Sequence, residues 1–468
     1  MAKQTQHFTR RTFLDRTARG TVGLMGYSLL NSAFSRAGNG SLNKSKVVLV
    51  KHDQASFIEQ DGRNKFYRVD QTVAQAMLNV GIKRLAGSDE LDLGEAWKNF
   101  FPGITRDKKI SIKVNCIAPG WVTNGLATHP EVAFGIANGL TCMQVDGQPF
   151  PAENITIWDR SDWELERAGF TINKSDQGVK CFGTRRFRTS GVKDGYDSAG
   201  YPINGSTQYL SKIFVEQTDY LINLCLLKDH STSGATLSMK NHYGTIHQPD
   251  CNPIHNNSCN PAIPQINAIP MLREKQVLCI CEAIYGINSG GPNAVPNITP
   301  NTILFSTDTV ALDTVGTDFL VQQGMSTYKA TKARRYLETA ASDAYQLGTC
   351  QLDQIDSDWI ENPATAISPE LTRRSDADFH LYQNFPNPFN AQTTLSYRLN
   401  QPQKVIINIY NLQGEFITNL VDACQQPGYH RIAWNGTTSN GLSVSSGLYL
   451  AQFQIGKVTK TVRMQLIK

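Results

Sequence analysis

Apolar runs alternate with segments of helical periodicity across residues 46–361. Val69, Val73, Met77 and Val80 recur at helical spacing and predict one apolar helix face, and the segment 130–140 begins with a Pro that suits a first helical turn. A further helix is predicted over 309–322. Predicted strands are the short apolar runs 46–50, 110–114, 155–158, 221–227, 277–284 and 302–306. Because 221–227 and 277–284 are apolar throughout, we expect strands covered on both faces and therefore an α/β domain with a mostly parallel sheet sandwiched by helices.

The pattern changes after Trp359. Residues 362–380 are polar, lack any period and predict a linker. Beyond them, short runs with β character are separated by turn residues such as Asn435-Gly436 and Asn440-Gly441. The runs are 393–399, 404–411, 415–421, 429–434, 448–455 and 459–467. They predict a C-terminal immunoglobulin-like antiparallel β-sandwich over residues 381–468.

Composition narrows the class of protein. A chain of 468 residues with 40% hydrophobic residues has enough apolar sequence for two or three folded domains. The net charge of +5 comes with no concentrated basic stripe, so nucleic-acid binding is not expected. No run reaches the roughly 18 to 20 apolar residues of a membrane span, so we expect no transmembrane segment in the mature chain. The ten cysteines form neither a ferredoxin-type iron–sulfur motif nor a haem-attachment motif.

The N-terminus carries an export pattern. Arg10-Arg11 is followed by Phe13-Leu14, then by a weakly apolar stretch over 20–30 and by the small-x-small sequence ending at Ala37. This arrangement resembles the twin-arginine signal, with Asp15 standing where Lys is commoner. The resemblance implies a signal peptide over residues 1–37 and delivery of a folded protein by the twin-arginine translocase. Loading of a cofactor before export is a common reason for that route.

Three motifs mark the C-terminal module. They are NFPNPFN (384–390), WNG (434–436) and SGLY (446–449). Together they resemble the type IX secretion C-terminal sorting domain over residues 381–468. The resemblance implies recognition by the type IX secretion machinery and a secreted or cell-surface location, while an ordinary immunoglobulin-like adhesion module is the alternative.

Polar groups gather where the predicted strands of the middle domain end, which is where open α/β sheets place ligands. The groups are KVN (113–115), DRS (159–161), KDH (228–230), KNHYG (240–244), SGGP (289–292) and the pair Asp308 and Asp313. As a set they resemble domain-of-unknown-function family 362, over roughly residues 46–325. Two features depart from that pattern: Glu282 stands where Asp is expected, and the ferredoxin-type cysteine clusters of many relatives are missing.

His230, Lys240 and His255 are the first candidate group for catalysis. The spacing of His230 and Lys240 resembles the nickel-pincer lactate racemase family, in which a Lys tethers the cofactor and His residues serve as base and ligand. Glu282 is a candidate acid–base partner. The resemblance makes a metal or organometallic cofactor one option for this domain.

A second interpretation is a cationic floor for a small anionic ligand. Lys113, Lys228 and Lys240 would supply the charge for a carboxylate or phosphate. The remaining candidate ligand-binding residues are Asn115, Asn241 and Asp308. Asp308 has an alternative role as the cap of the helix that follows it. The lysines and histidines have the alternative of satisfying loop carbonyls and acids.

The sequence HQPDCNPIHNNSC (247–259) sets His247, Cys251, His255 and Cys259 at intervals of four. Three prolines in or beside the segment argue against a helix, so the spacing alone does not place the four side chains on one face. Two thiolates and two imidazoles suit zinc if the loop folds around the ion. A Cys251–Cys259 disulfide and unlinked loop residues are the alternatives.

Three classes of function are compatible with these observations. The first is an exported enzyme that uses a bound metal or cofactor on a small anionic substrate. The second is a secreted protein that binds a metal or an anion without turnover. The third is a surface protein whose α/β domain is only a scaffold.

Overall fold

The computed structural model describes most of the chain. The predicted signal peptide, most of the predicted linker and the centre of the 384–390 motif lie outside the described residues. Those described are 44–61, 64–117, 125–187, 193–247, 251–365, 379–381, 384, 389–390, 392–399, 402–426, 428–456 and 458–466.

A nine-stranded sheet forms the centre of the α/β domain, in the order β15-β1-β14-β13-β11-β4-β7-β8 with β12 beside β11. The pairings from β13 through β11, β4 and β7 to β8 are parallel, as is the pairing of β15 with β1, whereas β14 and β12 run antiparallel to their neighbours. The predicted mostly parallel sheet is therefore confirmed. The strands are β1 (Ser45–Lys51), β4 (Ile110–Lys113), β7 (Ile155–Ser161), β8 (Lys180–Arg185), β11 (Tyr220–His230), β12 (Gly234–Thr236), β13 (Gln276–Ile287), β14 (Thr302–Ser306) and β15 (Ile355–Glu361).

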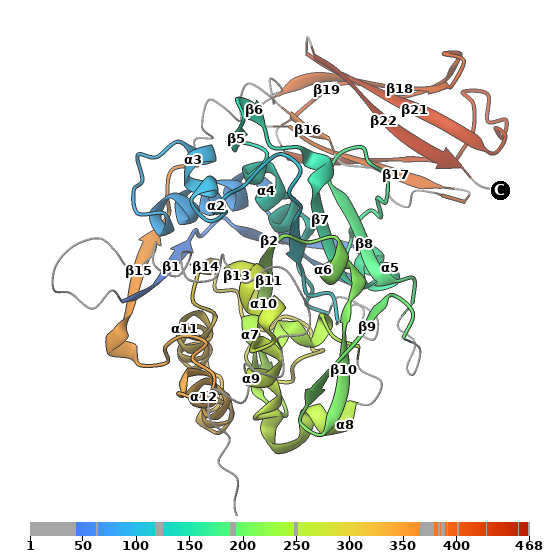
Figure 1. Cartoon of the computed structure of the whole chain (residues 1–468). Helices are drawn as coiled ribbons and strands as arrows, with labels where there is room; N and C mark the ends of the chain where they lie inside the picture. The colour runs from blue at the N-terminus through green and yellow to red at the C-terminus, as the bar shows by residue number, and fades with distance from the viewer. Residues whose placement is uncertain are drawn as a thin grey trace, which may run out of the picture.

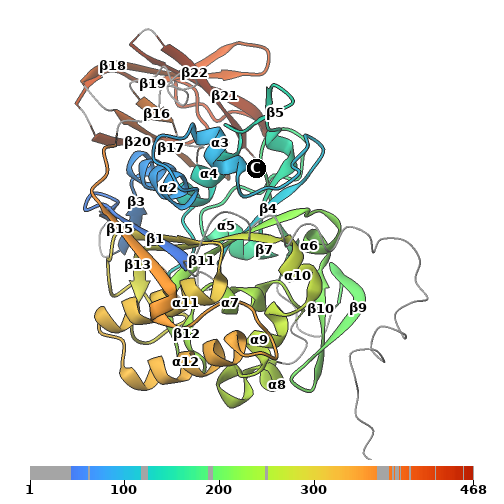
Figure 2. The ribbon, with the colours of Figure 1, turned by 60° about the vertical axis from the view of Figure 1, so that its left-hand side comes forward.

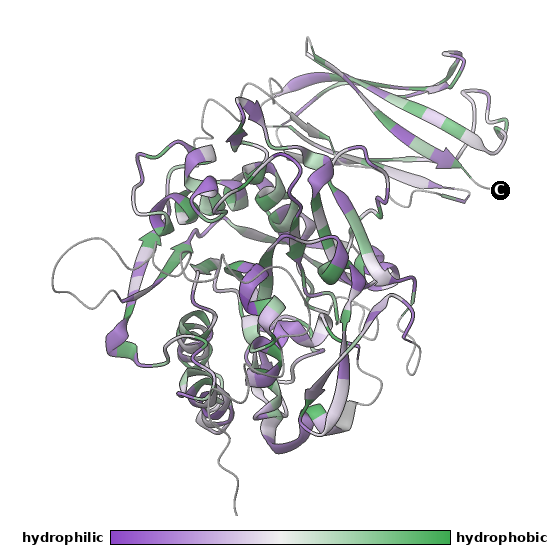
Figure 3. Cartoon of the chain, viewed as in Figure 1, coloured by the Kyte–Doolittle hydropathy of each residue, from purple (hydrophilic) through white to green (hydrophobic). Residues whose placement is uncertain are grey.

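Helices cover both faces of this sheet, as Figures 1 and 2 show. One face packs against α2 (Gln71–Leu85), α3 (Leu93–Lys98) and α4 (Pro130–Leu140). The other packs against α7 (Ser238–Asn241), α9 (Ala262–Asn267), α11 (Thr309–Gln322) and α12 (Thr327–Ala341). The central strands β11 and β13 are buried along nearly their whole length and are largely hydrophobic in Figure 3. Apolar burial on both faces is what a sheet between two helical layers requires.

Smaller elements surround these layers. The prolines of residues 247–261 argue against a helix, yet Pro253 lies inside the short helix α8 (Cys251–His255). Pro is tolerated there because the backbone N–H groups of a first helical turn have no partner within the helix. The helices are α5 (Asp162–Arg167), α6 (Lys212–Glu216), α8 (Cys251–His255), α10 (Pro270–Lys275), η1 (Ala152–Asn154), η2 (His242–Gly244), η3 (Asn256–Cys259) and η4 (Leu352–Gln354). The hairpins are β2 (Ser56–Asp61) with β3 (Asn64–Val69), β5 (Gln144–Val145) with β6 (Gln148–Pro149), and β9 (Tyr196–Ile203) with β10 (Ser206–Ser211).

The C-terminal module contains two antiparallel sheets, consistent with the predicted β-sandwich. It has its own apolar core, in which Trp434 packs against Phe389 and Tyr449. One sheet comprises β16 (Phe379–Leu381), β17 (Thr393–Leu399) and β20 (Gly428–Trp434). The other comprises β19 (Phe416–Gln425), β18 (Gln403–Asn411), β21 (Gly447–Ile455) and β22 (Val458–Leu466).

Within the described part of the chain, no helix combines the length and the apolar character that a membrane crossing needs.

Candidate functional site

The parallel strands β4, β7 and β11 bring their carboxyl ends to one edge of the sheet. Lys113, Asp159 and His230 lie at or near these ends. Strand β14 is antiparallel to both of its neighbours, so Asp308, two residues beyond its end, lies toward the opposite edge. There Asp308 is the N-cap of α11 and accepts from the backbone of Val310 and Ala311 at 2.9 Å. The structure therefore separates Asp308 from the other predicted ligand-binding residues and gives it the alternative capping role.

His230, Lys240, Tyr243 and His255 come together and are called the imidazole cluster here. The rings of His230 and His255 are stacked with centroids 5.9 Å apart. Lys240 Nζ lies 3.4 Å from His255 Nε2 and 3.5 Å from the centroid of the Tyr243 ring. Tyr243 also fixes the segment that carries His255, because its hydroxyl donates to the carbonyl of Ile254 at 2.6 Å. His230, Lys240 and His255, the first candidate group for catalysis, are thus neighbours.

His230 is held in one neutral tautomer. Its Nδ1 accepts from the backbone N–H groups of Thr232 at 3.0 Å and Ser233 at 3.2 Å. Burial and the neighbouring Lys240 and His255 lower the pKa of His230 to about 2. The ring is therefore neutral at physiological pH and carries its proton on Nε2. A protonated Nε2 donates a hydrogen bond but has no lone pair for a metal, so His230 in this state does not fit the role of metal ligand.

The position of Lys240 is set by a buried carboxylate on α11. Asp313 accepts from the backbone N–H and the hydroxyl of Ser238, at 2.8 Å and 2.6 Å, and from the backbone N–H of Met239 at 3.0 Å. The two backbone donors belong to the first turn of α7, whose N–H groups have no partner within the helix. Asn267 Nδ2 donates to the carbonyl of Met239 at 2.9 Å. The short helix that presents Lys240 is consequently fixed by side chains from two other helices.

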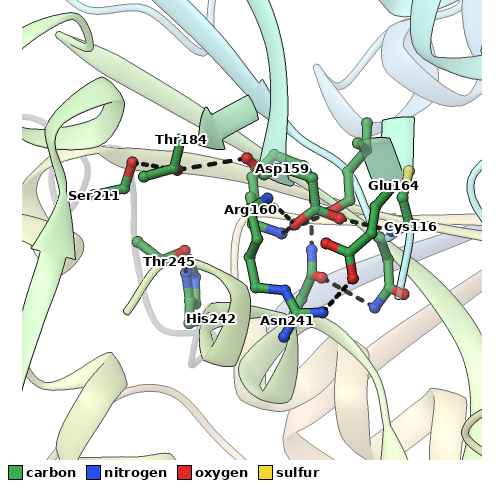
Figure 4. Close-up of polar contacts among 12 residues, drawn as sticks. Cys116, Asp159, Arg160, Glu164, Thr184, Ser211, Asn241, His242 and Thr245 are labelled. Carbon is green, nitrogen blue, oxygen red and sulfur yellow. Dashed lines mark hydrogen bonds and ion pairs between the residues drawn. The ribbon is translucent and has the colours of Figure 1, made fainter. Parts of the chain in front are cut away.

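Lys113 is neutralised within the protein. Its Nζ lies 2.8 Å from Asp159 Oδ1, and both side chains are almost fully buried. Asp159 Oδ2 accepts from the backbone of Cys116 at 2.7 Å, as Figure 4 shows. A Cβ at Gly244 would lie 2.6 Å from Lys113 Nζ, which explains the glycine of the KNHYG motif. Lys113 therefore adds no net charge to the proposed cationic floor.

The two candidate asparagines belong to a buried amide network. Asn115 Nδ2 donates to Asn241 Oδ1 at 3.1 Å, and Asn241 Nδ2 donates to Asn223 Oδ1 at 2.7 Å. Asn241 immediately follows Lys240 on α7. The network joins the end of β4 to β11 and to the helix that carries Lys240.

Glu282 and Lys228 lie apart from the contacts of the imidazole cluster. Glu282 is fully buried on β13, where its carboxylate contacts His129 Nδ1 and accepts from the backbone N–H of His129 at 3.1 Å. Lys228 is also fully buried and donates to the carbonyl of Leu126. Burial lowers the pKa of Lys228 to about 7. The partner of Glu282 is thus His129, and not His230 or Lys240 as expected.

The four residues predicted for zinc have different surroundings. His247 contacts the rings of Tyr196 and Tyr209, whereas His255 belongs to the imidazole cluster. Cys259 is a buried free cysteine, and the side chain of Cys251 lies outside the described residues. No group of three or more metal-binding side chains occurs among the residues whose placement is described.

Sequence reasoning missed His129 and Tyr243. Tyr243 stands in the KNHYG motif, so its nearness to Lys240 could have been inferred from the motif itself. His129 gave no comparable signal, because only the tertiary fold brings it to Glu282, 153 residues away.

Comparison with solved structures gives only partial similarities. Dimeric latent PorU from Porphyromonas gingivalis is 18% identical over 19% of this chain and 9% of its own, with a TM-score of 0.17. PorZ from the same organism, a surface component of the type IX secretion system, is 20% identical over 19% of this chain and 11% of its own, with a TM-score of 0.15. A protein from Thermotoga maritima is 9% identical over 53% of this chain and 57% of its own, with a TM-score of 0.26.

The chain spans about a tenth of the length of PorU and PorZ. A search of curated proteins found no match. Residues 110–318, which contain β4 through most of α11 and all four residues of the imidazole cluster, match the model of the family described as Domain of unknown function (DUF362).

Proposed function

We propose that the α/β domain is an enzyme that acts on a small anionic substrate at the imidazole cluster. One observation carries the proposal: the neutral His230, with its proton on Nε2, stands beside Lys240 and His255. An N–H donor next to an ammonium group binds carboxylate or phosphate oxygens through charge-assisted hydrogen bonds.

Lys240 and His255 supply the proton transfer in this proposal. An ammonium group can only donate, so His255 Nε2 is the acceptor of the 3.4 Å contact with Lys240 Nζ. A donor and an acceptor in contact form an acid–base pair that can exchange a proton with a bound substrate. His230 then orients the anion, and no metal is assigned to it.

Binding of two probe anions tests this proposal. We would titrate the full chain with lactate and with inorganic phosphate by calorimetry, and compare His230→Gln and Lys240→Gln. Loss of a charge-assisted hydrogen bond should weaken binding by roughly tenfold or more. Lys404→Gln is the matched control, because it removes the same charge from an exposed position in the C-terminal module.

Turnover is followed separately, by the loss of the C2 proton signal of lactate in deuterated water. Exchange that disappears in Lys240→Gln supports an enzyme. Binding without exchange favours the second candidate, a secreted anion-binding protein. If neither anion binds, or if all variants bind equally, the imidazole cluster is not an anion site.

We further propose that the twin-arginine translocase exports the chain and that the type IX secretion machinery then recognises it. The protein would reach the cell surface or the medium by this route. The Arg10-Arg11 motif and the three motifs of residues 384–449 support this route. The β-sandwich character of the C-terminal module is compatible with a sorting role.

A further inference from the structure

Lys228 is a buried amine without an ion pair among the described residues. Its side chain is 0% exposed, and its one hydrogen bond in the described structure goes to the carbonyl of Leu126. An ammonium group has three donors, so a charged Lys228 would leave donors unsatisfied in the protein interior. The pKa of about 7 reflects that burial, which outweighs the opposing effects of Cys116, Glu282 and Asp159.

Glu282 and Asp159, the two carboxylates whose charge raises the pKa of Lys228, already bind other groups. Glu282 is bound by the ring and the backbone N–H of His129, and Asp159 is bound by Lys113 and by the backbone of Cys116. Each acid thus has its own cationic partner. A lysine left without a counter-ion favours the neutral amine, which is the nucleophilic form.

His129 carries a proton beside Glu282. Its Nδ1 contacts Glu282 Oε1 and its Nε2 lies 3.3 Å from the carbonyl of Tyr67, so both ring nitrogens face acceptors. Burial lowers the pKa of His129, but the charge of Glu282 and its hydrogen bond outweigh burial, and the pKa is raised. The His129–Glu282 pair can therefore give up a proton and take it back.

One buried oxygen beside Lys228 has no hydrogen-bond partner among the described residues: Thr236 Oγ1. Thr236 stands directly opposite Lys228 in the β11–β12 pairing, so both side chains point to the same face. A buried oxygen of this kind calls for a partner such as a hydroxyl group of a ligand.

We propose that Lys228 forms an imine with a small, uncharged hydroxy-aldehyde or hydroxy-ketone. The Nζ lone pair attacks the carbonyl carbon, and the C=O π pair moves to the oxygen, which takes a proton from the His129–Glu282 pair. The carbinolamine nitrogen then gives up two protons as the C=N bond forms: one leaves with the hydroxyl group as water, and the other returns to the pair. The sum is amine plus carbonyl giving imine plus water, so no oxidant or reductant is needed.

Reductive trapping tests this inference on the full chain. The protein is incubated with glycolaldehyde, reduced with sodium borohydride, digested and mapped by mass spectrometry. We expect one reduced adduct on Lys228, which rises from about pH 6 to about pH 8 as the amine loses its proton. In Lys228→Met, which is as uncharged as the buried amine but cannot form an imine, that adduct should vanish.

Adducts confined to exposed lysines, with Lys228 unmodified at the higher pH, would overturn the inference. The wild-type map decides this even if the Lys228→Met variant does not fold. The inference is independent of the anion site proposed above: labelling that persists in His230→Gln while anion binding is lost separates the two, and intact anion binding without labelling overturns this inference alone.

Discussion

At the scale of single residues, burial of His230 makes stability depend on pH. An unfolded histidine titrates near pH 6.5, but the folded His230 has a pKa of about 2. Below pH 6.5 the unfolded chain therefore binds a proton that the native protein does not, and stability is lost as the pH falls. Between pH 7 and pH 5 this loss is on the order of 2 kcal/mol.

His230→Gln isolates this contribution, because every other titrating group is shared with the wild type. Denaturant unfolding at the two pH values should show that the wild type loses about 2 kcal/mol more than the variant. The same loss in both proteins would mean that His230 takes up its proton without unfolding.

The three candidate lysines show where residue-level prediction from sequence ends. Lys113, Lys228 and Lys240 could all be identified from strand-end motifs, and the structure places all three inside the protein. Their chemistry differs because their partners differ. Lys113 has Asp159, Lys240 has His255 and Tyr243, and Lys228 has one backbone carbonyl among the described residues. The partner of Lys113 is 46 residues away in the chain, so no local pattern could reveal which lysine was neutralised.

At the scale of elements, two aspartates on α11 cap two different helices. Asp308 caps α11 itself, and Asp313 holds the start of α7. Asp308→Ala should cost about 2 to 3 kcal/mol, because α11 loses its N-cap and the hydroxyl of Ser45 and the backbone N–H of Thr349 lose their acceptor, and it should leave anion binding unchanged. Asp313→Ala should cost about 2 to 4 kcal/mol, because buried N–H groups of Ser238 and Met239 lose their acceptor, and should weaken anion binding through Lys240.

Unfolding by denaturant and calorimetric titration of the two variants provide the comparison. Equal effects on binding would show that Asp313 does not position Lys240. Lys240→Gln serves as the reference for complete loss of the amine.

Long elements with clear periodicity were predicted closely, and short ones were not. The helices at 130–140 and 309–322 and the strand at 302–306 have the predicted bounds, since apolar pattern and start signals agree there. Helix α7 has four residues, too few for a period, and depends on Asp313 for its start. The direction of β14 is set by its neighbours in the sheet, which is why the edge on which Asp308 lies could not be predicted.

At the scale of the whole molecule, the apolar cores divide the chain. The two cores of the α/β domain draw on residues up to Ile360, and the core of the C-terminal module draws on residues from Leu381 onward. Strand β15 belongs to the first part, because it pairs along its full length with β1. A fragment of residues 44–365 should therefore fold alone and bind anions as the full chain does.

A second fragment, residues 44–354, provides the contrast. It lacks β15, so the apolar strand β1 becomes an uncovered edge with unpaired backbone groups. We expect a lower unfolding midpoint and concentration-dependent association on size-exclusion chromatography, neither of which should occur with 44–365. If both fragments behave alike, β15 is dispensable and the domain ends before it. If both fail to fold, the α/β domain depends on the C-terminal module for its stability.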